Sequence, residues 1–363
     1  MELLLLLLLI SASYLLVGVV GNHAAPPLPS EVYWKNKLPN TPMPTIIHDL
    51  LHPSDQQRKA SIDRSENRNI FIPTHTNTIF EQENFQKYSK KTSLQKLNLS
   101  QPLQQFALSK YAPKLGKSTT TNDNAETNRQ LINNPGASLF FLETDLYPGA
   151  KMNLHFVVGT PSGTTFLPQK LAKVIPFSSN KLLEILNHFS IDPKSEEAEL
   201  ISQIIMDCEQ PAIENEEKYC ATSLESLVEY GTSRLGKNVN VLTTVIVGDK
   251  GERTRMRKQQ YVVSSGVRNI VSDNLVACHS LPYLYAVFYC HATASHTTRT
   301  YAVPLVGADG MKIKATAVCH KDTSKWDPDH VAFQVLMVKP GTVPICHFLT
   351  EDSIVWVAKN KDN

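Results

Sequence analysis

Four of the six cysteines in this 363-residue chain are followed directly by a histidine. These Cys-His pairs are Cys278-His279, Cys290-His291, Cys319-His320 and Cys346-His347. Thiolate and imidazole are both ligands of zinc and copper, and cysteines also form disulfides. Because the chain has only 12 histidines, four such neighbours are far more than chance would place. The repeated dipeptide therefore indicates a metal centre, a disulfide framework, or both.

The two residues of a pair can have separate roles if the pair lies on a β-strand. Neighbouring side chains on an extended strand point to opposite faces, so a cysteine and its histidine do not easily reach one metal ion. We therefore expect the cysteines to face one way and form disulfides, and the histidines to face the other way and converge. Cys208 and Cys220, separated by an acidic loop, are expected to form a third bridge. Six cysteines allow fifteen pairings, so the partners of the other four stay open.

Four converging imidazoles would form a transition-metal site. Without thiolates in the ligand set, neutral histidine favours copper as the cofactor. His330 is a lesser candidate ligand, and His296 is a weaker one. One alternative is zinc bound by both residue types, but the Cys-His region lacks the C-x(2–4)-C or H-x(3–5)-H spacing of structural zinc sites. Another alternative is that the four histidines are ordinary core residues beside their disulfides.

The N-terminal residues predict secretion, which would place the cysteines in an oxidising compartment. An apolar run from Leu3 to about Val20 precedes small residues and a Pro-rich stretch, which is typical of a signal peptide, here residues 1–24. An uncleaved membrane anchor is the alternative, because the run is nearly long enough to span a bilayer. We expect no membrane association after cleavage. The net charge of +2 argues against nucleic acid as a partner, and Asn98 lies in a glycosylation sequon.

Residues 25–137 differ in composition from the rest of the chain. They hold half of the 22 prolines and no cysteine, and they are rich in Asn, Thr, Ser, Gln and Lys. Such a segment buries too little apolar surface to offset the entropy of ordering, so we expect a largely disordered leader. Residues 31–53, "EVYWKNKLPNTPMPTIIHDLLHP", are richer in aromatic and aliphatic side chains and suggest a docking segment.

Residues 138–363 have a globular composition and enough length for one core. Helices are expected at 178–189 behind Ser178 or Ser179, from Asp192-Pro193 through Cys208, and from a Thr222/Glu225 capping box to a stop at Gly231. Short β-branched or aromatic segments predict strands at 240–249, 259–267, 283–291, 299–306, 311–320, 330–338 and 353–358, with a hairpin turn at 306–312. The expected fold is α+β, with a helical first half followed by an antiparallel β-rich half that carries the four Cys-His pairs and is braced by disulfides.

The spacing of the pairs resembles the signature of the BURP-domain family of plants. It reads CH-x10-CH-x27-CH-x25-CH-x8-W and ends at Trp356. Other segments are similar to that family too: residues 139–152, "LFFLETDLYPGAKM"; 219–230, "YCATSLESLVEY"; 326–341, "WDPDHVAFQVLMVKPG"; and the leader segment 33–44, "YWKNKLPNTPMP". The resemblance covers residues 138–363 and part of the leader.

The resemblance implies a secreted plant protein of the apoplast, cell wall or a vacuolar storage compartment. Some family members are seed, dehydration-responsive or polygalacturonase-associated proteins without assigned chemistry. Others are copper-dependent peptide cyclases, which join a Tyr or Trp side chain oxidatively to a nearby residue of a core peptide, often in the same precursor. Carried onto this chain, the family's histidines are His279, His291, His320 and His347, and its paired cysteines are Cys278, Cys290, Cys319 and Cys346.

The chain departs from the cyclase pattern in its leader, which has no repeat and a single tryptophan, Trp34. The best core-peptide candidate runs from Gln104 to Tyr111, and a second ends at Tyr88. Three tyrosines between the first two pairs are expected to be core aromatics rather than radical carriers: Tyr283, Tyr285 and Tyr289. The leading hypothesis is a secreted copper-binding peptide cyclase acting on its own leader or another peptide. The alternative is a non-enzymatic seed, stress or cell-wall protein whose disulfides and metal are structural.

Overall fold

The computed structural model describes the leader segment 28–52 and most of the chain from residue 139 onward. The described ranges are 28–52, 139–156, 164–212, 216–247, 258–270, 274–293, 297–326, 328 and 330–359. Several predicted features lie outside them: the signal peptide 1–24, Tyr88, Asn98, Gln104, Tyr111 and His296. Within the described ranges, no helix has the length and apolar character needed to cross a membrane.

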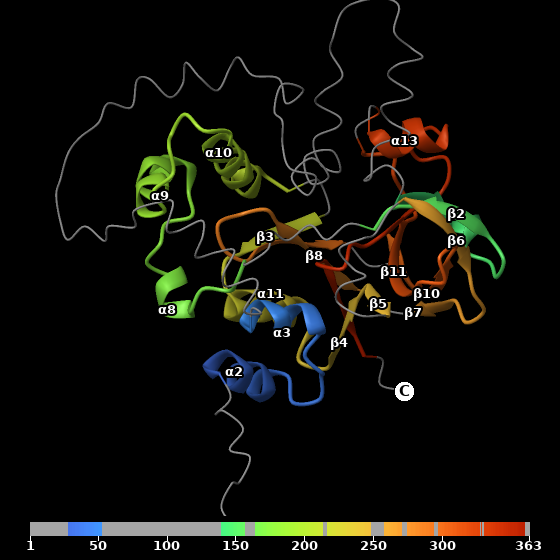
Figure 1. Cartoon of the computed structure of the whole chain (residues 1–363), viewed down its shortest axis with the longest axis horizontal. Coiled ribbons are helices and arrows are strands. Elements are labelled where there is room, and N and C mark those ends of the chain that lie inside the picture. Colours follow the sequence, from blue (N-terminus) through green and yellow to red (C-terminus); the bar gives the residue numbers. More distant parts are fainter. Residues whose placement is uncertain are drawn as a thin grey trace, which may run out of the picture.

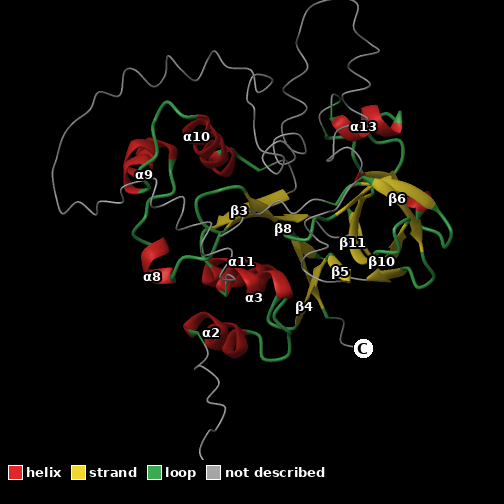
Figure 2. Cartoon of the chain, in the orientation of Figure 1, coloured by secondary structure: helices red, strands yellow, loops and turns green. Residues whose placement is uncertain are grey.

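The larger of two antiparallel sheets has eight strands in the order β1-β12-β11-β10-β6-β2, with β5 paired to β11 and β7 to β10. Its strands are β1 (Phe140–Leu142), β2 (Lys151–Leu154), β5 (Val245–Val247), β6 (Gln259–Val263), β7 (Arg268–Ile270), β10 (Thr298–Gly307), β11 (Lys312–His320) and β12 (Ile345–Phe348). In Figure 2 these strands curve around a shared interior. That interior is filled by buried side chains such as Phe141, Tyr261, Leu305 and Phe348.

The smaller sheet has five strands in the order β3-β9-β8-β13-β4. They are β3 (Glu216–Ala221), β4 (Val239–Thr243), β8 (Leu275–Leu281), β9 (Val287–Thr293) and β13 (Ile354–Ala358). Helix α11 (Leu224–Leu235) covers one face, where Leu227 and Val228 pack with Phe288 and Trp356 in one apolar core.

The remaining helices are short and lie around the two sheets (Figure 1). They are η5 (Glu143–Asp145), α8 (Gln169–Ala172), η6 (Ser179–Lys181), α9 (Leu182–His188), α10 (Glu196–Glu209) and α13 (Val331–Leu336). Helices α9 and α10 form a separate apolar cluster with the chain that enters β9, in which Ile185, Ile204 and Val287 are fully buried.

The two sheets are held together by a small apolar cluster drawn from both of them. Ala277 of β8 and Val355 of β13 pack with Val318 of β11 and with Leu349, which follows β12. Alternation along a strand then places the residue two positions further on at the same face. After Ala277 and Val318 these residues are His279 and His320.

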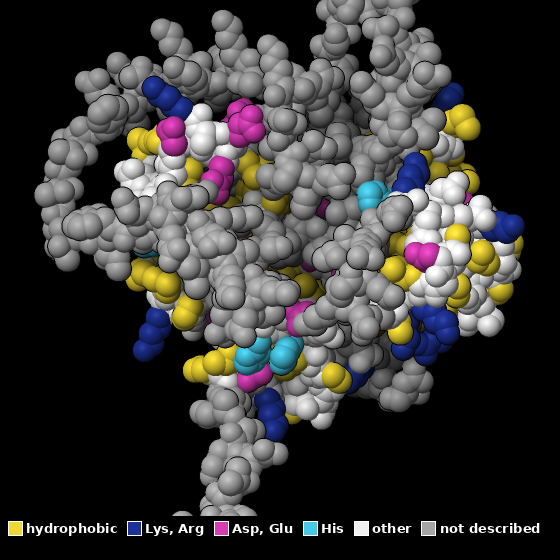
Figure 3. Space-filling view, in the orientation of Figure 1, with side chains coloured by type: hydrophobic (Ala, Val, Ile, Leu, Met, Phe, Trp, Pro, Cys, Tyr) yellow, Lys and Arg dark blue, Asp and Glu magenta, His cyan; other side chains and the backbone are white. Residues whose placement is uncertain are grey.

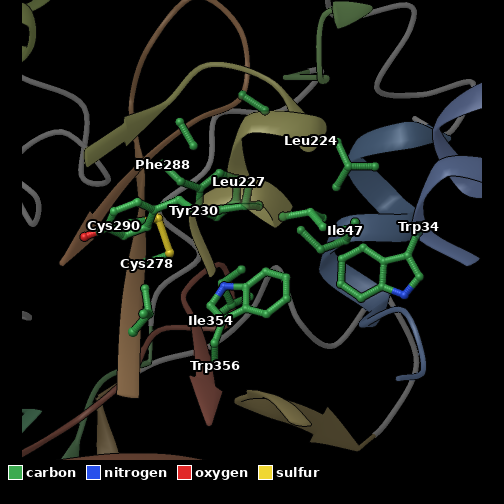
Figure 4. Close-up of a cluster of buried hydrophobic side chains, with 14 of the residues drawn as sticks. Trp34, Ile47, Leu224, Leu227, Tyr230, Cys278, Phe288, Cys290, Ile354 and Trp356 are labelled. Carbon is green, nitrogen blue, oxygen red and sulfur yellow. A yellow bond between two sulfur atoms is a disulfide. The ribbon is translucent and has the colours of Figure 1, made fainter. Parts of the chain in front are cut away.

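The docking segment of the leader forms two helices, α2 (Pro29–Lys37) and α3 (Thr45–Leu51). Trp34 is only 3% exposed, and its ring centroid lies 5.7 Å from that of Trp356 (Figure 4). The indole N–H of Trp34 donates to the carbonyl of Thr41 over 2.9 Å. Residues 28–52 therefore dock on the domain, because this segment carries enough apolar surface to bury.

The mixed α+β class and the antiparallel second half are confirmed, although β1, β2 and β3 also place strands in the half expected to be helical. The predicted strand at 330–338 is wrong: it forms helix α13, where His330 Nδ1 accepts from the Ala332 amide over 3.2 Å. This cap satisfies the Ala332 N–H. In a β-strand that N–H would instead bond to a neighbouring strand. Met337 then ends the helix in a left-handed conformation (φ 54°).

The predicted helix boundaries shift by a few residues. The caps are Ser195 and Ser223 rather than Asp192 and Thr222, and the helix at 178–189 opens with the short η6 turn. The predicted stop at Gly231 is wrong, since α11 continues to Leu235 and ends at Gly236, whose φ is +74°. Gly231 has a different purpose: a Cβ there would lie 2.8 Å from Trp356 Cδ2. The helix can approach β13 closely only because this residue has no side chain.

This close approach can be tested with Gly231→Ala. Alanine normally stabilises a helix over glycine by about 0.5–1 kcal/mol, but here we expect the free energy of unfolding to fall by about 1–3 kcal/mol because the core is overpacked. Urea denaturation followed by circular dichroism measures the difference. The control is Ser233→Ala, at an exposed position of the same helix, which should change stability by less than about 0.5 kcal/mol. A neutral or stabilising Gly231→Ala would contradict the packing described.

Candidate metal centre

All six cysteines form disulfides, and two of the bridges cross directly between neighbouring strands. Cys278 of β8 lies opposite Cys290 of β9, and Cys319 of β11 lies opposite Cys346 of β12; both bridges have a Cα–Cα distance of 3.9 Å. The expected third bridge, Cys208–Cys220, joins α10 to β3 with a Cα–Cα distance of 5.8 Å. No thiolate is then left for a zinc site built from both residue types.

Strand alternation separates each cysteine from its histidine, as the dipeptides predict. Cys278 and Cys290 are 0% exposed and lie in the core beneath α11, where their disulfide is visible in Figure 4. Cys319 and Cys346 are equally buried inside the larger sheet. The histidines therefore project from the opposite face of each strand pair, toward the junction of the two sheets.

Each of these two strand pairs, β8–β9 and β11–β12, brings its two histidines into contact through the same ring atoms. His279 Nε2 lies 3.4 Å from His291 Nε2, and the two rings are 19° from parallel. His320 Nε2 lies 3.4 Å from His347 Nε2, with an interplanar angle of 12°. Two nitrogens bound to one tetrahedral metal at about 2.0–2.1 Å are themselves about 3.3 Å apart. Either pair therefore has the spacing of two ligands on a single ion.

The two pairs face each other but do not form one tight cluster. The rings of His279 and His347, from different sheets, have centroids 6.5 Å apart. Among the described residues, no three of these four histidines have ligand atoms that all lie within 4.8 Å of one another. The expected convergence thus takes the form of two adjacent two-histidine sites.

Burial keeps the pair on the larger sheet uncharged. Desolvation lowers the pKa of His320 well below its usual 6.5, and the neighbouring His347 adds to the effect. Desolvation also lowers the pKa of His347 to about 4. Both imidazoles are therefore neutral at pH 7, so that each keeps a nitrogen lone pair available for a metal.

Two polar residues contact the far side of the rings on the smaller sheet. Glu216 of β3 places a carboxylate oxygen 3.6 Å from His291 Nδ1, and Ser353 Oγ lies 3.4 Å from His279 Nδ1. Partners at this nitrogen orient a metal-ligating histidine and raise its basicity. Neither residue was identified from the sequence, because only the pairing of β3 with β9 and of β13 with β8 brings them to the histidines.

His330 lies beside the histidine pairs but belongs to an aromatic cluster. Its ring centroid is 4.8 Å from that of Trp326, which is in turn 4.8 Å from that of His320. Its Nδ1 caps α13, so only Nε2 could bind a metal without loss of the cap. His330 and Trp326 together form one wall of the site.

The three tyrosines between the first two pairs have different surroundings. Tyr283 and Tyr285 are buried in the cluster under α9 and α10, as expected of core aromatics. Tyr289 is only partly buried and its ring centroid lies 6.1 Å from that of His291, so it borders the candidate metal centre. Burial raises the pKa of Tyr289 to about 12, which keeps its phenol protonated at pH 7.

Comparison with known proteins identifies the family. The family model described as "BURP domain" matches residues 139–358. BURP domain-containing protein 3 of Oryza sativa subsp. japonica is 49% identical over 235 residues, covering 64% of this chain and 53% of that protein. BURP domain protein RD22 of Arabidopsis thaliana is 46% identical over 230 residues, covering 62% and 57% respectively.

A third relative is similar along almost the whole chain. BURP domain-containing protein 2 of Oryza sativa subsp. japonica is 34% identical over 356 residues, covering 94% of this chain and 96% of its own. By contrast, the matched part spans little more than half the length of BURP domain-containing protein 3 and of RD22. The family model covers well over half of this chain, with all four Cys-His pairs inside the match. The chain is a member of the BURP domain family.

Proposed function

We propose that the two histidine pairs hold copper and that the chain is an oxidative peptide cyclase, which crosslinks a Tyr or Trp side chain within a peptide. The observation that carries this proposal is the arrangement of the two Nε2–Nε2 contacts of 3.4 Å, one on each sheet, at the junction of the sheets. A single buried histidine would be an ordinary core residue. Two matched pairs with ligand spacing support a metal-binding role.

The chemistry of the proposed reaction favours copper over zinc. The ligands are imidazoles only, because every cysteine is in a disulfide, and imidazole sites accept either metal. Joining a phenol or indole to an unactivated carbon removes two hydrogens, a redox step that zinc does not support. Bound copper supplies one-electron chemistry with dioxygen as the oxidant.

The contribution of the protein's own residues is to orient the ligands and the peptide. Ser353 contacts the ring of His279 at Nδ1, and Glu216 places a carboxylate 3.6 Å from Nδ1 of His291. The side chain of His291 is 15% exposed, so the pair on the smaller sheet borders solvent, where a peptide can approach. Tyr289 and Trp326 provide aromatic surface beside the two pairs, suited to stacking with a Tyr or Trp of the peptide.

The substrate in this proposal is a peptide outside the described part of the chain. Trp34 is unsuitable as a crosslinking partner because it is buried against Trp356 and hydrogen-bonded through its indole N–H. The candidates in the leader stay Tyr88 and the segment from Gln104 to Tyr111, and a separate peptide is the other source. Signal-peptide cleavage and glycosylation at Asn98, with delivery to the apoplast, cell wall or vacuole, belong to the same proposal.

A second function is supported by the disulfides themselves. Three bridges hold α10, β3 and both histidine-bearing strand pairs in place. In that case the metal would brace the junction of the sheets, and the chain would be a non-enzymatic seed, stress or cell-wall protein with a cell-wall component as its partner. Both functions predict the same copper binding, but only the first predicts oxidation of a peptide.

Copper binding can be assigned pair by pair. Relative to the wild type, His279→Ala and His320→Ala should each lower the copper-to-protein ratio by one, because each removes one ligand of a separate pair. The ratio is measured by elemental analysis after Cu(II) loading and desalting, with the exposed His188→Ala on α9 as the control. Unchanged copper in both variants would contradict the proposal.

Two of the disulfides provide matched variants that test whether a bridge positions the histidine ligands. Cys278–Cys290 and Cys208–Cys220 both span a sequence separation of 12 residues, so replacing either pair by alanine should cost a similar loop entropy, about 3 kcal/mol. Only the Cys278→Ala/Cys290→Ala variant should also weaken copper binding, because only that bridge lies between two histidine ligands. Equal copper affinity in the two variants would show that the bridge does not position the pair.

Catalysis is tested by mass spectrometry. Copper-loaded protein incubated in air should lose two hydrogens, about 2 Da, in a leader peptide containing Tyr88 or Tyr111, because closing the crosslink oxidises the peptide by two electrons. His291→Ala should abolish the mass change, and incubation without oxygen should prevent it. An unchanged leader would contradict self-modification and favour either a separate peptide substrate or the structural role.

A further inference from the structure

A second group of metal-binding side chains lies in the docked leader, apart from the Cys-His pairs. It consists of Glu31 on α2, His48 on α3, and His52 at the C-terminal cap of α3. One ligand atom from each of the three lies within 4.8 Å of the other two. Among the described residues this is the one set of three or more His, Cys, Asp or Glu side chains that meets this condition.

The two histidines are spaced by one turn of helix. His48 and His52 are four positions apart, the His52 amide donates to the His48 carbonyl over 2.9 Å, and the ring centroids are 4.6 Å apart. Side chains with this spacing lie on one face of a helix. The H-x3-H spacing typical of zinc ligands, which is absent from the Cys-His region, thus occurs in the leader.

Glu31 completes the set from the neighbouring helix. One of its carboxylate oxygens lies 2.9 Å from His52 Nε2, and the other accepts a hydrogen bond from the Leu28 amide over 2.9 Å. These contacts lower the pKa of the Glu31 carboxyl, so it is an anion at pH 7. The Leu28 contact also fixes the carboxylate at the start of α2, with one oxygen turned toward the histidines.

The scaffold beneath the three ligands is rigid. Trp34, Ile47 and Leu50 anchor both helices in the apolar core under α11, each at most 4% exposed. Thr41 in the connection donates its hydroxyl to the carbonyl of Val239. Three prolines also restrict this connection, at positions 39, 42 and 44. The relative position of α2 and α3 is therefore set by the fold rather than by the metal.

The ligands themselves are accessible to ions. The side chains of His52 and Glu31 are 38% and 25% exposed, and His48 is an exposed residue. In Figure 3 histidine and acidic side chains lie together on the surface over α2 and α3. An ion could enter from solvent, and water could complete its coordination.

We propose that Glu31, His48 and His52 form a surface site for a zinc-class divalent ion, which clamps the end of α3 to the start of α2. Two imidazoles, one carboxylate and a water match the tetrahedral sites that zinc occupies in proteins. The site is independent of the copper proposal, because the α11 core and the smaller sheet separate α2 and α3 from the face that carries His279 and His291.

The probe is Zn²⁺ alone, added to the metal-stripped full chain and followed by isothermal titration calorimetry at neutral pH. The wild type should bind one more zinc ion than Glu31→Gln, His48→Ala or His52→Ala, or bind that ion more than about 100-fold more tightly, because each variant lacks one ligand. Glu31→Gln keeps an oxygen that can accept from Leu28, so α2 retains its cap. His48 is exposed, so His48→Ala removes a ligand without opening the core.

His188→Ala is the matched control, since it removes an exposed histidine from α9 and should leave zinc binding unchanged. His279→Ala should retain the leader site, which separates failure of this proposal from failure of the copper proposal. Hydrogen exchange provides a second readout: zinc should slow exchange of the α3 amides in the wild type and in His188→Ala, but not in His48→Ala. Equal zinc binding and equal exchange in the wild type and His48→Ala would overturn the site.

Discussion

The structure of the candidate metal centre depends on one constraint: the opposite orientation of neighbouring side chains on a β-strand. In each of the two strand pairs, β8–β9 and β11–β12, cysteines that face each other across the strands form a bridge. The adjoining histidines must then lie on the other face, diagonally across the same strand pair. The disulfide prevents the strands from slipping, and a slip of one residue would turn every histidine into the core. Covalent bridging and ligand placement are thus two consequences of one register.

A second constraint comes from the packing of the sheets. Each strand pair by itself could supply only two imidazoles. The apolar cluster around Ala277, Val318 and Val355 brings the two sheets together, and it places one histidine pair opposite the other. The same packing partly buries His320 and His347, and the resulting desolvation lowers the pKa of both, so they are neutral at pH 7. Apolar burial therefore sets both the geometry and the protonation state of the centre.

The leader is also attached to the domain by apolar packing. Trp34 and Trp356 pack against each other, and Trp356 in turn lies against Gly231 of α11. The tryptophan that ends the Cys-His signature is thus the contact point of β13, α11 and α2. This arrangement explains how residues 28–52 of a polar, proline-rich leader pack on the domain. It also places Glu31, His48 and His52 on a fixed base at the surface.

Much of this protein could be predicted from its sequence because the controlling interactions are local. The Cys-His dipeptides, their spacing, the α+β class and most strands follow from patterns within a few residues. The errors arose where tertiary contacts override local preference. Gly231 reads as a helix stop but is a contact point for Trp356, and residues 330–338 read as a strand but are capped by His330 as a helix.

The sequence by itself therefore determined the family, the separation of cysteine from histidine and the residue types available for a metal. Only the tertiary structure decided how the cysteines of the four Cys-His pairs are bridged, that the four histidines form two pairs, and that Glu216 and Ser353 contact them. The same holds for the cluster in the leader, where Glu31 lies seventeen positions before His48 along the chain. The physical reason is that strand pairing and helix docking join residues far apart in sequence, and no local pattern records those contacts.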